Sequence, residues 1–266
     1  MPFASIASSP LAPGVSPVRI HYREFGSGRP LFFLHGGWGY DIYPFARQIA
    51  ELERDHRIVV PDRTGYGRSG RLEAQEIDFH RRAAGETFAL IDALGVERPL
   101  LWGHSDGAVI ALHMALAEPR RLRAVILEAV HLYGHKPASR DFFDTMMRDP
   151  DGLGERVAGV LARDHGDGWR DVIRINGVAW RRIGDQQRAP DDDLFGGGLV
   201  DLRVPALVIH GANDPRTEPG ELDALRAKLP SARFAILADG GHSPHSERLT
   251  AEAVTSVARE FIDGVA

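Results

Sequence analysis

The pentapeptide Gly103-His104-Ser105-Asp106-Gly107 stands where a short apolar run, residues 99–102, gives way to a longer one, residues 108–117. A Gly-x-Ser-x-Gly sequence between a strand and a helix forms a sharp turn that exposes the serine hydroxyl at the edge of a sheet. The two glycines are needed there because larger side chains would collide in so tight a turn. The sequence therefore predicts that Ser105 is a nucleophile rather than part of an ordinary glycine-serine turn.

Similar short apolar runs recur along the chain, and stretches with helical spacing separate them. Such runs are typical of strands buried on both faces, and the alternation indicates right-handed crossovers with helices on both sides of the sheet. We therefore expect an α/β fold with a mostly parallel, twisted sheet. The predicted strands are residues 18–24, 31–34, 57–60, 99–102, 124–127, 206–209 and 233–237. The predicted helices are residues 79–94, 108–117, 221–229 and 251–262.

Residues 131–200 break this alternation, because they hold aromatic residues and methionines among many charges but no buried strand run. We interpret them as a helical lid, inserted after the predicted strand 124–127, that covers the active edge of the sheet. Residues 18–130 and 201–266 would then form the core. The Ser/Pro-rich residues 1–17 are expected to be a flexible N-terminal arm.

The composition of the 266-residue chain excludes several classes of function. A net charge of −5 argues against a duplex nucleic-acid binder, which needs a concentrated basic face. The absence of cysteine removes disulfides and thiolate metal sites. No apolar run approaches the roughly 20 residues that span a bilayer, and the first residues lack the pattern of a secretory signal. We expect a cytoplasmic protein with no nucleic-acid partner; monomer and homodimer both stay open.

The chain offers a base for Ser105, because a serine hydroxyl is a weak nucleophile on its own. His242 follows the last predicted strand in a glycine-rich loop. The carboxyl ends of parallel strands gather at one edge of a sheet, so His242 can meet Ser105 although the two are far apart in sequence. His245 is the rival base, and we expect it to point outward.

The histidine needs a carboxylate that fixes its tautomer and stabilises its charged form. Asp214 follows the predicted strand 206–209 and is the first candidate. Glu128 is the alternative, because it ends the predicted strand 124–127 at the same edge. An oxyanion hole is also required, and the backbone N–H of Asp106 is expected to supply one donor.

The second oxyanion donor should come from the loop after the predicted strand 31–34, where glycines let the backbone approach a substrate oxygen closely. This loop reads His35-Gly36-Gly37-Trp38-Gly39. The N–H of Gly37 is our first choice and that of Trp38 our second.

These motifs together resemble the α/β-hydrolase superfamily, especially its small lidded serine esterases. The matching segments are His35-Gly36-Gly37, residues 62–69, residues 103–107, Asp214 and His242. The resemblance spans about residues 19–262, and it implies the α/β-hydrolase fold and a triad in the chain order Ser, Asp, His. Residues 131–200 match no known lid, and this is the part in which members differ most in substrate.

Asp106 is the unusual residue of the pentapeptide, because a carboxylate beside the nucleophile adds negative charge where an oxyanion must form. One interpretation, which we favour, is that Asp106 caps the N-terminus of its helix. The other comes from the resemblance: valacyclovir-hydrolase-like relatives carry Ser-Asp-Gly at this place, which suggests recognition of a substrate amino group.

The sequence thus predicts a serine hydrolase that cleaves a carboxylic ester of a small to medium, largely apolar molecule through an acyl-enzyme. We expect no cofactor and no metal, since zinc needs three or four ligands and only His242 and His245 are suitably spaced. Residues that could contact substrate are Trp38, Asp106, Phe142, Met146 and Trp180.

Amide, thioester, lactone and C–C bond hydrolysis use the same triad, and the fold does not choose among them. Dehalogenases and many epoxide hydrolases resemble the chain as well, but they use an aspartate nucleophile, which Ser105 argues against. A ligand-binding receptor without catalysis on the same fold is a further alternative.

Overall fold

A single sheet organises the computed structural model, which describes residues 2–187, 189 and 192–265. Within these residues eight strands follow the order β1-β2-β4-β3-β5-β6-β7-β8, and all neighbours from β4 to β8 are parallel, whereas β1 and β2 are antiparallel. The mostly parallel sheet predicted from the sequence is therefore confirmed. The strands are β1 Phe3–Ile6, β2 Val18–Phe25, β3 Arg29–Leu34, β4 His56–Pro61, β5 Leu100–His104, β6 Ala124–Glu128, β7 Ala206–Gly211 and β8 Arg233–Leu237.

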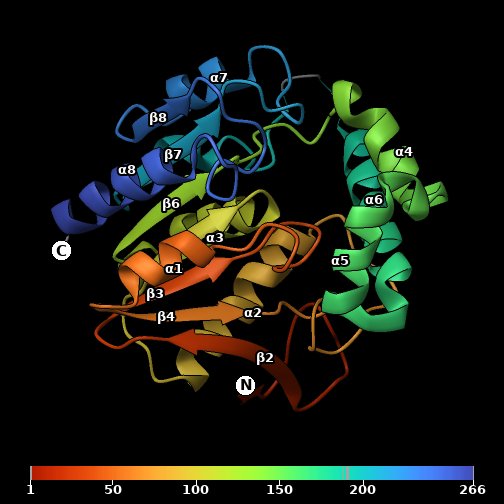
Figure 1. Ribbon diagram of the computed structural model, residues 1–266, viewed down its shortest axis with the longest axis horizontal. Helices are drawn as coiled ribbons and strands as arrows, with labels where there is room; N and C mark the ends of the chain where they lie inside the picture. The colour runs from red at the N-terminus through yellow and green to blue at the C-terminus, as the bar shows by residue number, and fades with distance from the viewer. Residues whose placement is uncertain (1, 188, 190–191, 266) are drawn as a thin grey trace.

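Helices cover both faces of this sheet, as Figure 1 shows. The α-helices are α1 Ala46–Leu52, α2 Phe79–Ala93, α3 Asp106–Ala117, α4 Arg140–Arg148, α5 Glu155–His165, α6 Trp169–Gln186, α7 Glu221–Lys228 and α8 Ala251–Gly264. Short 3-10 turns are Pro119–Arg121, Pro137–Ser139, Pro150–Leu153, Gly166–Gly168 and Gly198–Asp201.

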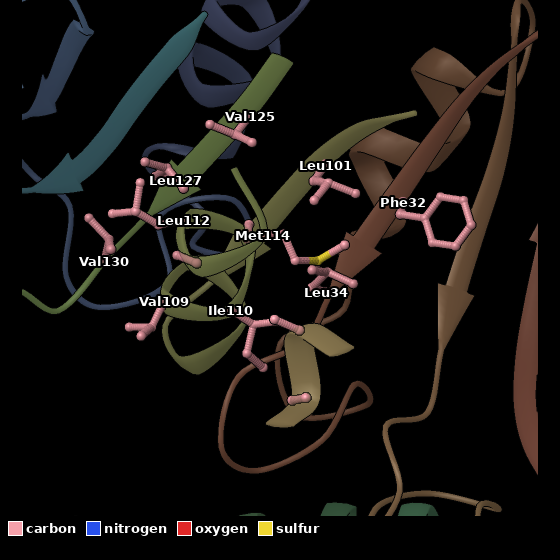
Figure 2. Packing of buried hydrophobic residues seen from close by; sticks show 14 of the residues in the cluster. Phe32, Leu34, Leu101, Val109, Ile110, Leu112, Met114, Val125, Leu127 and Val130 are labelled. Atoms are coloured by element: carbon pink, nitrogen blue, oxygen red, sulfur yellow. The ribbon is translucent and has the colours of Figure 1, made fainter. Parts of the chain in front are cut away.

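The strand β3 explains why both faces must be covered. Phe32 and Leu34 belong to the apolar cluster shared with α2 and α3, whereas Leu31 and Phe33 belong to the cluster shared with α1 and α8. Because successive side chains of a strand point to opposite faces, an uninterrupted apolar strand needs a partner layer on each side. Figure 2 shows the first of these layers, with Phe32 and Leu34 on the same side of the sheet as α3.

The helix α3 lies directly behind the serine that precedes it. Ala108, Val109, Ala111 and Leu112 are fully buried, so this helix is apolar almost all round, as predicted for residues 108–117. In Figure 2 its side chains face Leu101, Val125 and Leu127 of the central strands. A helix packed on all sides holds its first turn, and thus Ser105, in a fixed place.

The expected flexible arm over residues 1–17 is corrected by the structure. β1 pairs with β2, with Phe3 opposite His21 and Ile6 opposite Val18. Ile6 and Leu11 are buried, and they join the apolar cluster that contains α2. A strand of four residues is too short to give a reliable period in the sequence, so its place at the sheet edge comes from tertiary packing.

The insertion predicted after the strand 124–127 contains α4, α5 and α6, which lie between β6 and β7 in the chain and at one end of the sheet in Figure 1. We call these three the cap helices. α4 packs closely on α6 at Gly177, where a Cβ atom would come within 2.9 Å of Cβ of Met146. Movement of the cap helices as a lid stays a prediction. Nowhere in the described residues does a helix have the length and apolarity needed to cross a membrane.

Candidate active site

The turn between β5 and α3 has the strained geometry that the pentapeptide predicts. Ser105 adopts φ 54° and ψ −121°, a backbone conformation that residues with a side chain rarely enter. A Cβ atom on Gly103 would lie 2.1 Å from the carbonyl oxygen of Gly107, and one on Gly107 would lie 2.0 Å from that of Leu34. Both glycines are therefore required by the close approach of backbone to backbone.

The structure brings Ser105, His242 and Asp214 together at the carboxyl ends of β5, β8 and β7. Nε2 of His242 lies 3.1 Å from Oγ of Ser105. Nδ1 of the same ring lies 3.0 and 2.9 Å from the two carboxylate oxygens of Asp214. A proton on Nδ1 leaves the lone pair of Nε2 free to accept the serine hydroxyl, which is the arrangement that a general base needs.

The carboxylate of Asp214 is held in its charged form. Burial would raise its pKa, but the charge and the hydrogen bond of His242 outweigh burial and keep the pKa well below the usual range. The backbone N–H of Arg216 donates to the same carboxylate at 2.8 Å. A fixed anion behind the imidazole would stabilise an imidazolium at His242.

The rival base His245 is buried, so the expectation that it points outward is wrong. Its Nδ1 lies 2.8 Å from a carboxylate oxygen of Glu128, and its Nε2 lies 2.9 Å from the carbonyl oxygen of Tyr43. The ring stacks on Phe45 with centroids 4.0 Å apart. Both ring nitrogens are occupied, so His245 has no lone pair to offer a nucleophile, and Glu128 serves His245 rather than His242.

Gly37 and Asp106, the predicted oxyanion donors, both line the cavity that contains Ser105. Within the described residues, neither the N–H of Gly37 nor that of Asp106 donates to another group, and the first N–H groups of a helix lack partners in the helix itself. A Cβ atom on Gly37 would come within 2.6 Å of Oδ1 of Asn176 and 2.9 Å of Oδ2 of Asp106. A larger residue at position 37 would therefore have to displace the side chains of Asn176 and Asp106, which are hydrogen-bonded to each other.

The side chain of Asp106 does not cap its helix, so the interpretation we favoured from the sequence is wrong. It turns away from the helix N-terminus, where no side-chain capping bond exists, toward the cap helix α6. Oδ1 accepts from Nε2 of His80 at 3.2 Å and from Nε1 of Trp180 at 3.0 Å. Oδ2 accepts from Nδ2 of Asn176 at 3.0 Å.

Asp106 nevertheless stays charged. Burial would raise its pKa, but the hydrogen bond from His80 and the nearby charge of Arg63, whose Nη2 lies 4.0 Å away, lower the pKa to about 2. Burial lowers the pKa of His80 itself, which favours the neutral imidazole. The cavity therefore contains an anion next to Ser105 that is solvated by neutral donors.

A cavity of about 150 Å³ opens above Ser105 between the sheet edge and the cap helices. Four of the residues expected to contact substrate line it, namely Trp38, Asp106, Phe142 and Trp180. Met146 does not line the cavity. Its side chain is fully buried between α4 and α6, because it lies on the face of α4 that packs against Gly177 of α6. Lining residues that the sequence analysis missed are Tyr43, His131, Phe143, Asn176, Pro215 and Arg216.

His131 is a missed residue that contacts the nucleophile. Its Nε2 lies 3.4 Å from Oγ of Ser105, and its ring stacks on that of His242 with centroids 5.7 Å apart. Burial, followed by the charge of Lys136, holds its pKa well below the usual value, so the ring is neutral. The available signal was topological, since residue 131 follows β6 at the same edge that carries the other candidates.

No group of three or more histidine, aspartate or glutamate side chains in the described part of the chain is arranged to hold a metal ion. The arrangement of Ser105, His242 and Asp214 is the one that nucleophilic attack by a serine hydroxyl would require.

Comparison with known proteins agrees with the fold. Residues 31–254 match the model of the "Alpha/beta hydrolase family". The human "Serine hydrolase BPHL" is 25% identical over 91% of this chain and 82% of its own length. The "Pimeloyl-[acyl-carrier protein] methyl ester esterase" of Vibrio campbellii is 27% identical over 85% of this chain and 92% of its own. Among solved structures, a thermophilic esterase from Thermogutta terrifontis has a TM-score of 0.73 at 23% identity, covering 100% of this chain and 99% of its own.

Proposed function

We propose, from the premise that this chain belongs to the alpha/beta hydrolase family, that it hydrolyses a carboxylic ester of a small to medium molecule through an acyl-enzyme. The observation that carries the proposal is the chain of contacts from Asp214 through His242 to Ser105, with 3.1 Å between the last imidazole nitrogen and the hydroxyl. The names of relatives such as the methyl ester esterase support an ester substrate over an amide, a thioester or a lactone.

In the proposed reaction, Oγ of Ser105 attacks the acyl carbon while Nε2 of His242 takes the hydroxyl proton. The N–H groups of Asp106 and Gly37, with Trp38 as the alternative to Gly37, hold the oxyanion of the tetrahedral intermediate. The imidazolium then gives its proton to the departing alkoxide, and an acyl-enzyme remains. His242 next deprotonates a water molecule that attacks the acyl carbon, and the acid leaves as Ser105 regains its proton.

The size of the cavity supports a small acyl or alcohol group beside Ser105. A volume of about 150 Å³ is comparable to that of cavities that accommodate benzene. Aromatic side chains form much of the wall: Phe143 stacks on Trp180 with centroids 5.6 Å apart, and Phe142 stacks on Trp38 at 5.4 Å. Such walls bind flat or apolar groups well.

A second candidate concerns substrates that carry an ammonium group. Asp106 lines the cavity as an anion, and three hydrogen bonds leave one of the roughly four acceptor positions of a carboxylate open. Hydrolysis of amino-acid esters should therefore be compared with that of matched neutral esters, for the wild type and Asp106→Asn. A preference for the amine that is unchanged in the variant would rule this candidate out.

The main proposal is tested with a fluorophosphonate probe and a panel of p-nitrophenyl esters, thioesters, lactones and anilides. We expect the wild type to be labelled and to favour the esters, and Ser105→Ala to lose both properties. Ser256→Ala, a change on the exposed side of α8, is the matched control and should behave as the wild type. An unlabelled wild type that cleaves none of the panel would instead support a ligand-binding protein without catalysis.

A further inference from the structure

The guanidinium of Arg216 has no internal anion to pair with. Among the described residues that line the cavity, it is the only permanently positive side chain. No carboxylate of the described chain comes within ion-pair distance of its guanidinium, and no described group accepts a hydrogen bond from it. The charge interactions that it does have are with Asp214 and Tyr43 through space.

This guanidinium is nevertheless held in place. It lies over the ring of Phe142 with 3.6 Å between Cζ and the ring centroid. The backbone of Arg216 is fixed as well, because its N–H donates to Asp214 at 2.8 Å and its carbonyl accepts from Nζ of Lys136 at 3.1 Å. Stacking occupies one face of the guanidinium and leaves its N–H donors directed outward around its edge.

A second stacked arginine, Arg170, shows what Arg216 lacks. Arg170 also stacks on an aromatic ring, that of Trp169 at 4.5 Å, but its donors are used by Asp151 at 2.8 and 2.7 Å. Arg170 is well exposed, whereas Arg216 is partly buried, and its burial lowers its pKa. A partly desolvated cation without a counter-ion destabilises the folded protein, and such groups gather at binding sites.

The anions near Arg216 are already compensated, so they would not prevent a further anion from binding. The carboxylate of Asp214 accepts from Nδ1 of His242, and Nε2 of His210 lies 3.5 Å from it. The carboxylate of Asp106 accepts from three neutral donors and has Arg63 nearby. The fork of a guanidinium matches the two oxygens of a carboxylate, which it binds through paired hydrogen bonds.

We propose that Arg216 is an anion subsite of the candidate active site, and that the substrate is an ester with a free carboxylate that pairs with this guanidinium. The proposal rests on the function proposed above and narrows its substrate class. The substrate would be either a half-ester of a dicarboxylic acid or a hydroxy acid whose hydroxyl is acylated and whose carboxylate is free. Arg216 selects the substrate; the bond-making and bond-breaking steps stay with Ser105 and His242.

Paired substrates test this, because each carboxylate has a neutral partner of similar shape. In the first pair, monomethyl adipate carries a carboxylate on the acyl side of the ester, and dimethyl adipate is its neutral partner. In the second pair, 3-acetoxypropanoate carries the carboxylate on the alcohol side, and its N-methylamide is the neutral partner. Release of acid is followed in a pH-stat for the wild type, Arg216→Met and Arg216→Lys. The matched control is Arg226→Met, since Arg226 of α7 lies 5.7 Å over the ring of Phe234 and does not line the cavity.

We expect Arg216→Met to lower kcat/KM for at least one carboxylate substrate by about ten- to a hundredfold, mainly through KM, and that for its neutral partner by less than about threefold. Arg216→Lys should keep part of the preference, because it keeps the charge without the fork. High salt should weaken the preference of the wild type. The pair that responds shows which side of the ester carries the carboxylate.

Equal losses on charged and neutral substrates would overturn the proposal, because Arg216 would then only hold Phe142 in place. Unchanged preference in Arg216→Met would overturn it too. Failure of the wild type on every ester would contradict the proposed function instead. In that case titration calorimetry with adipate still decides about Arg216, since binding that survives Arg216→Met would exclude an anion subsite there.

Discussion

Two histidine–carboxylate pairs lie at the same edge of the sheet, and only one of them is suited to catalysis. Nδ1 of His242 lies 2.9 Å from Asp214, and Nδ1 of His245 lies 2.8 Å from Glu128. The difference is at the other nitrogen: Nε2 of His242 faces Oγ of Ser105, whereas Nε2 of His245 faces the carbonyl oxygen of Tyr43. The His242 side chain is 20% exposed and that of His245 is not exposed.

The comparison teaches that a carboxylate behind a histidine does not by itself mark a base. A base also needs a free lone pair that faces a cavity, and His242 has this because its loop follows the last strand beside the cavity. The buried pair has a different task. Glu128 accepts from Nε1 of Trp102 at 3.0 Å and from two nitrogens of His245 at 2.9 and 2.8 Å, which ties the loop after β8 to the sheet.

The largest expected effect separates the two histidines by activity. His242→Ala should lower kcat for ester hydrolysis by about ten thousand- to a millionfold, because the serine loses its base, while the fold is kept. His245→Gln should lower kcat by less than about tenfold at a temperature where the variant is folded. Steady-state kinetics with circular dichroism checks both, and comparable losses in kcat would end the distinction between the pairs.

The second effect is a loss of stability when the buried pair of Glu128 and His245 is broken. Glu128→Leu leaves the three donors that Glu128 now accepts without partners, so the free energy of unfolding should fall by about 3–5 kcal/mol. Urea denaturation measures this loss. The matched control is Glu252→Leu on the exposed side of α8, which should change the free energy by less than about 0.5 kcal/mol. A similar loss in both variants would contradict the structural role of Glu128.

The third effect is a pH dependence of stability that comes from His104, whose ring lies between those of His242 and His245. Nε2 of His104 lies 2.9 Å from the carbonyl oxygen of His242, and burial lowers its pKa to about 3, against about 6.5 in an unfolded chain. The unfolded chain binds this proton first. The contribution of His104 is therefore fully present above about pH 6.5 and is lost as the pH falls toward about 3.

Denaturation of the wild type and His104→Gln at several values between pH 7.5 and 4.5 tests this prediction. The free energy of unfolding of the wild type should fall more steeply, by up to about 1.4 kcal/mol per pH unit for one proton. Parallel curves for the two proteins would show that His104 does not take up the proton on unfolding.

The smallest expected effect concerns His131, which lies beside Ser105 and His242. His131 lies 3.4 Å from Oγ of Ser105, and its pKa is held well below the usual value, so it binds a proton weakly and would orient the hydroxyl rather than act as the base. We expect His131→Phe to lower kcat by about two- to tenfold with an unchanged pH profile, and His131→Gln to restore part of the loss. A loss as large as that of His242→Ala would mean that the two rings share the work of the base.

The sheet, its central helix and the three side chains that meet at its edge could be predicted from the sequence. These follow from local rules: apolar runs buried on both faces, a Gly-x-Ser-x-Gly turn that tolerates no larger side chain, and the common edge of parallel strands. Asp214 and His242 could be chosen from the sequence because each directly follows a strand in a glycine-containing loop, where the backbone fixes their approach to Ser105.

The contacts of several other side chains could not be predicted and depend on how the chain packs. This packing placed Asp106 against α6 rather than on its own helix, buried His245, added β1 to the sheet edge, and brought His131 and Arg216 to the cavity. The physical reason is that these contacts join segments far apart in the chain, through side chains whose directions depend on packing. A pattern of residue types along one segment does not show which distant segment its side chains will contact.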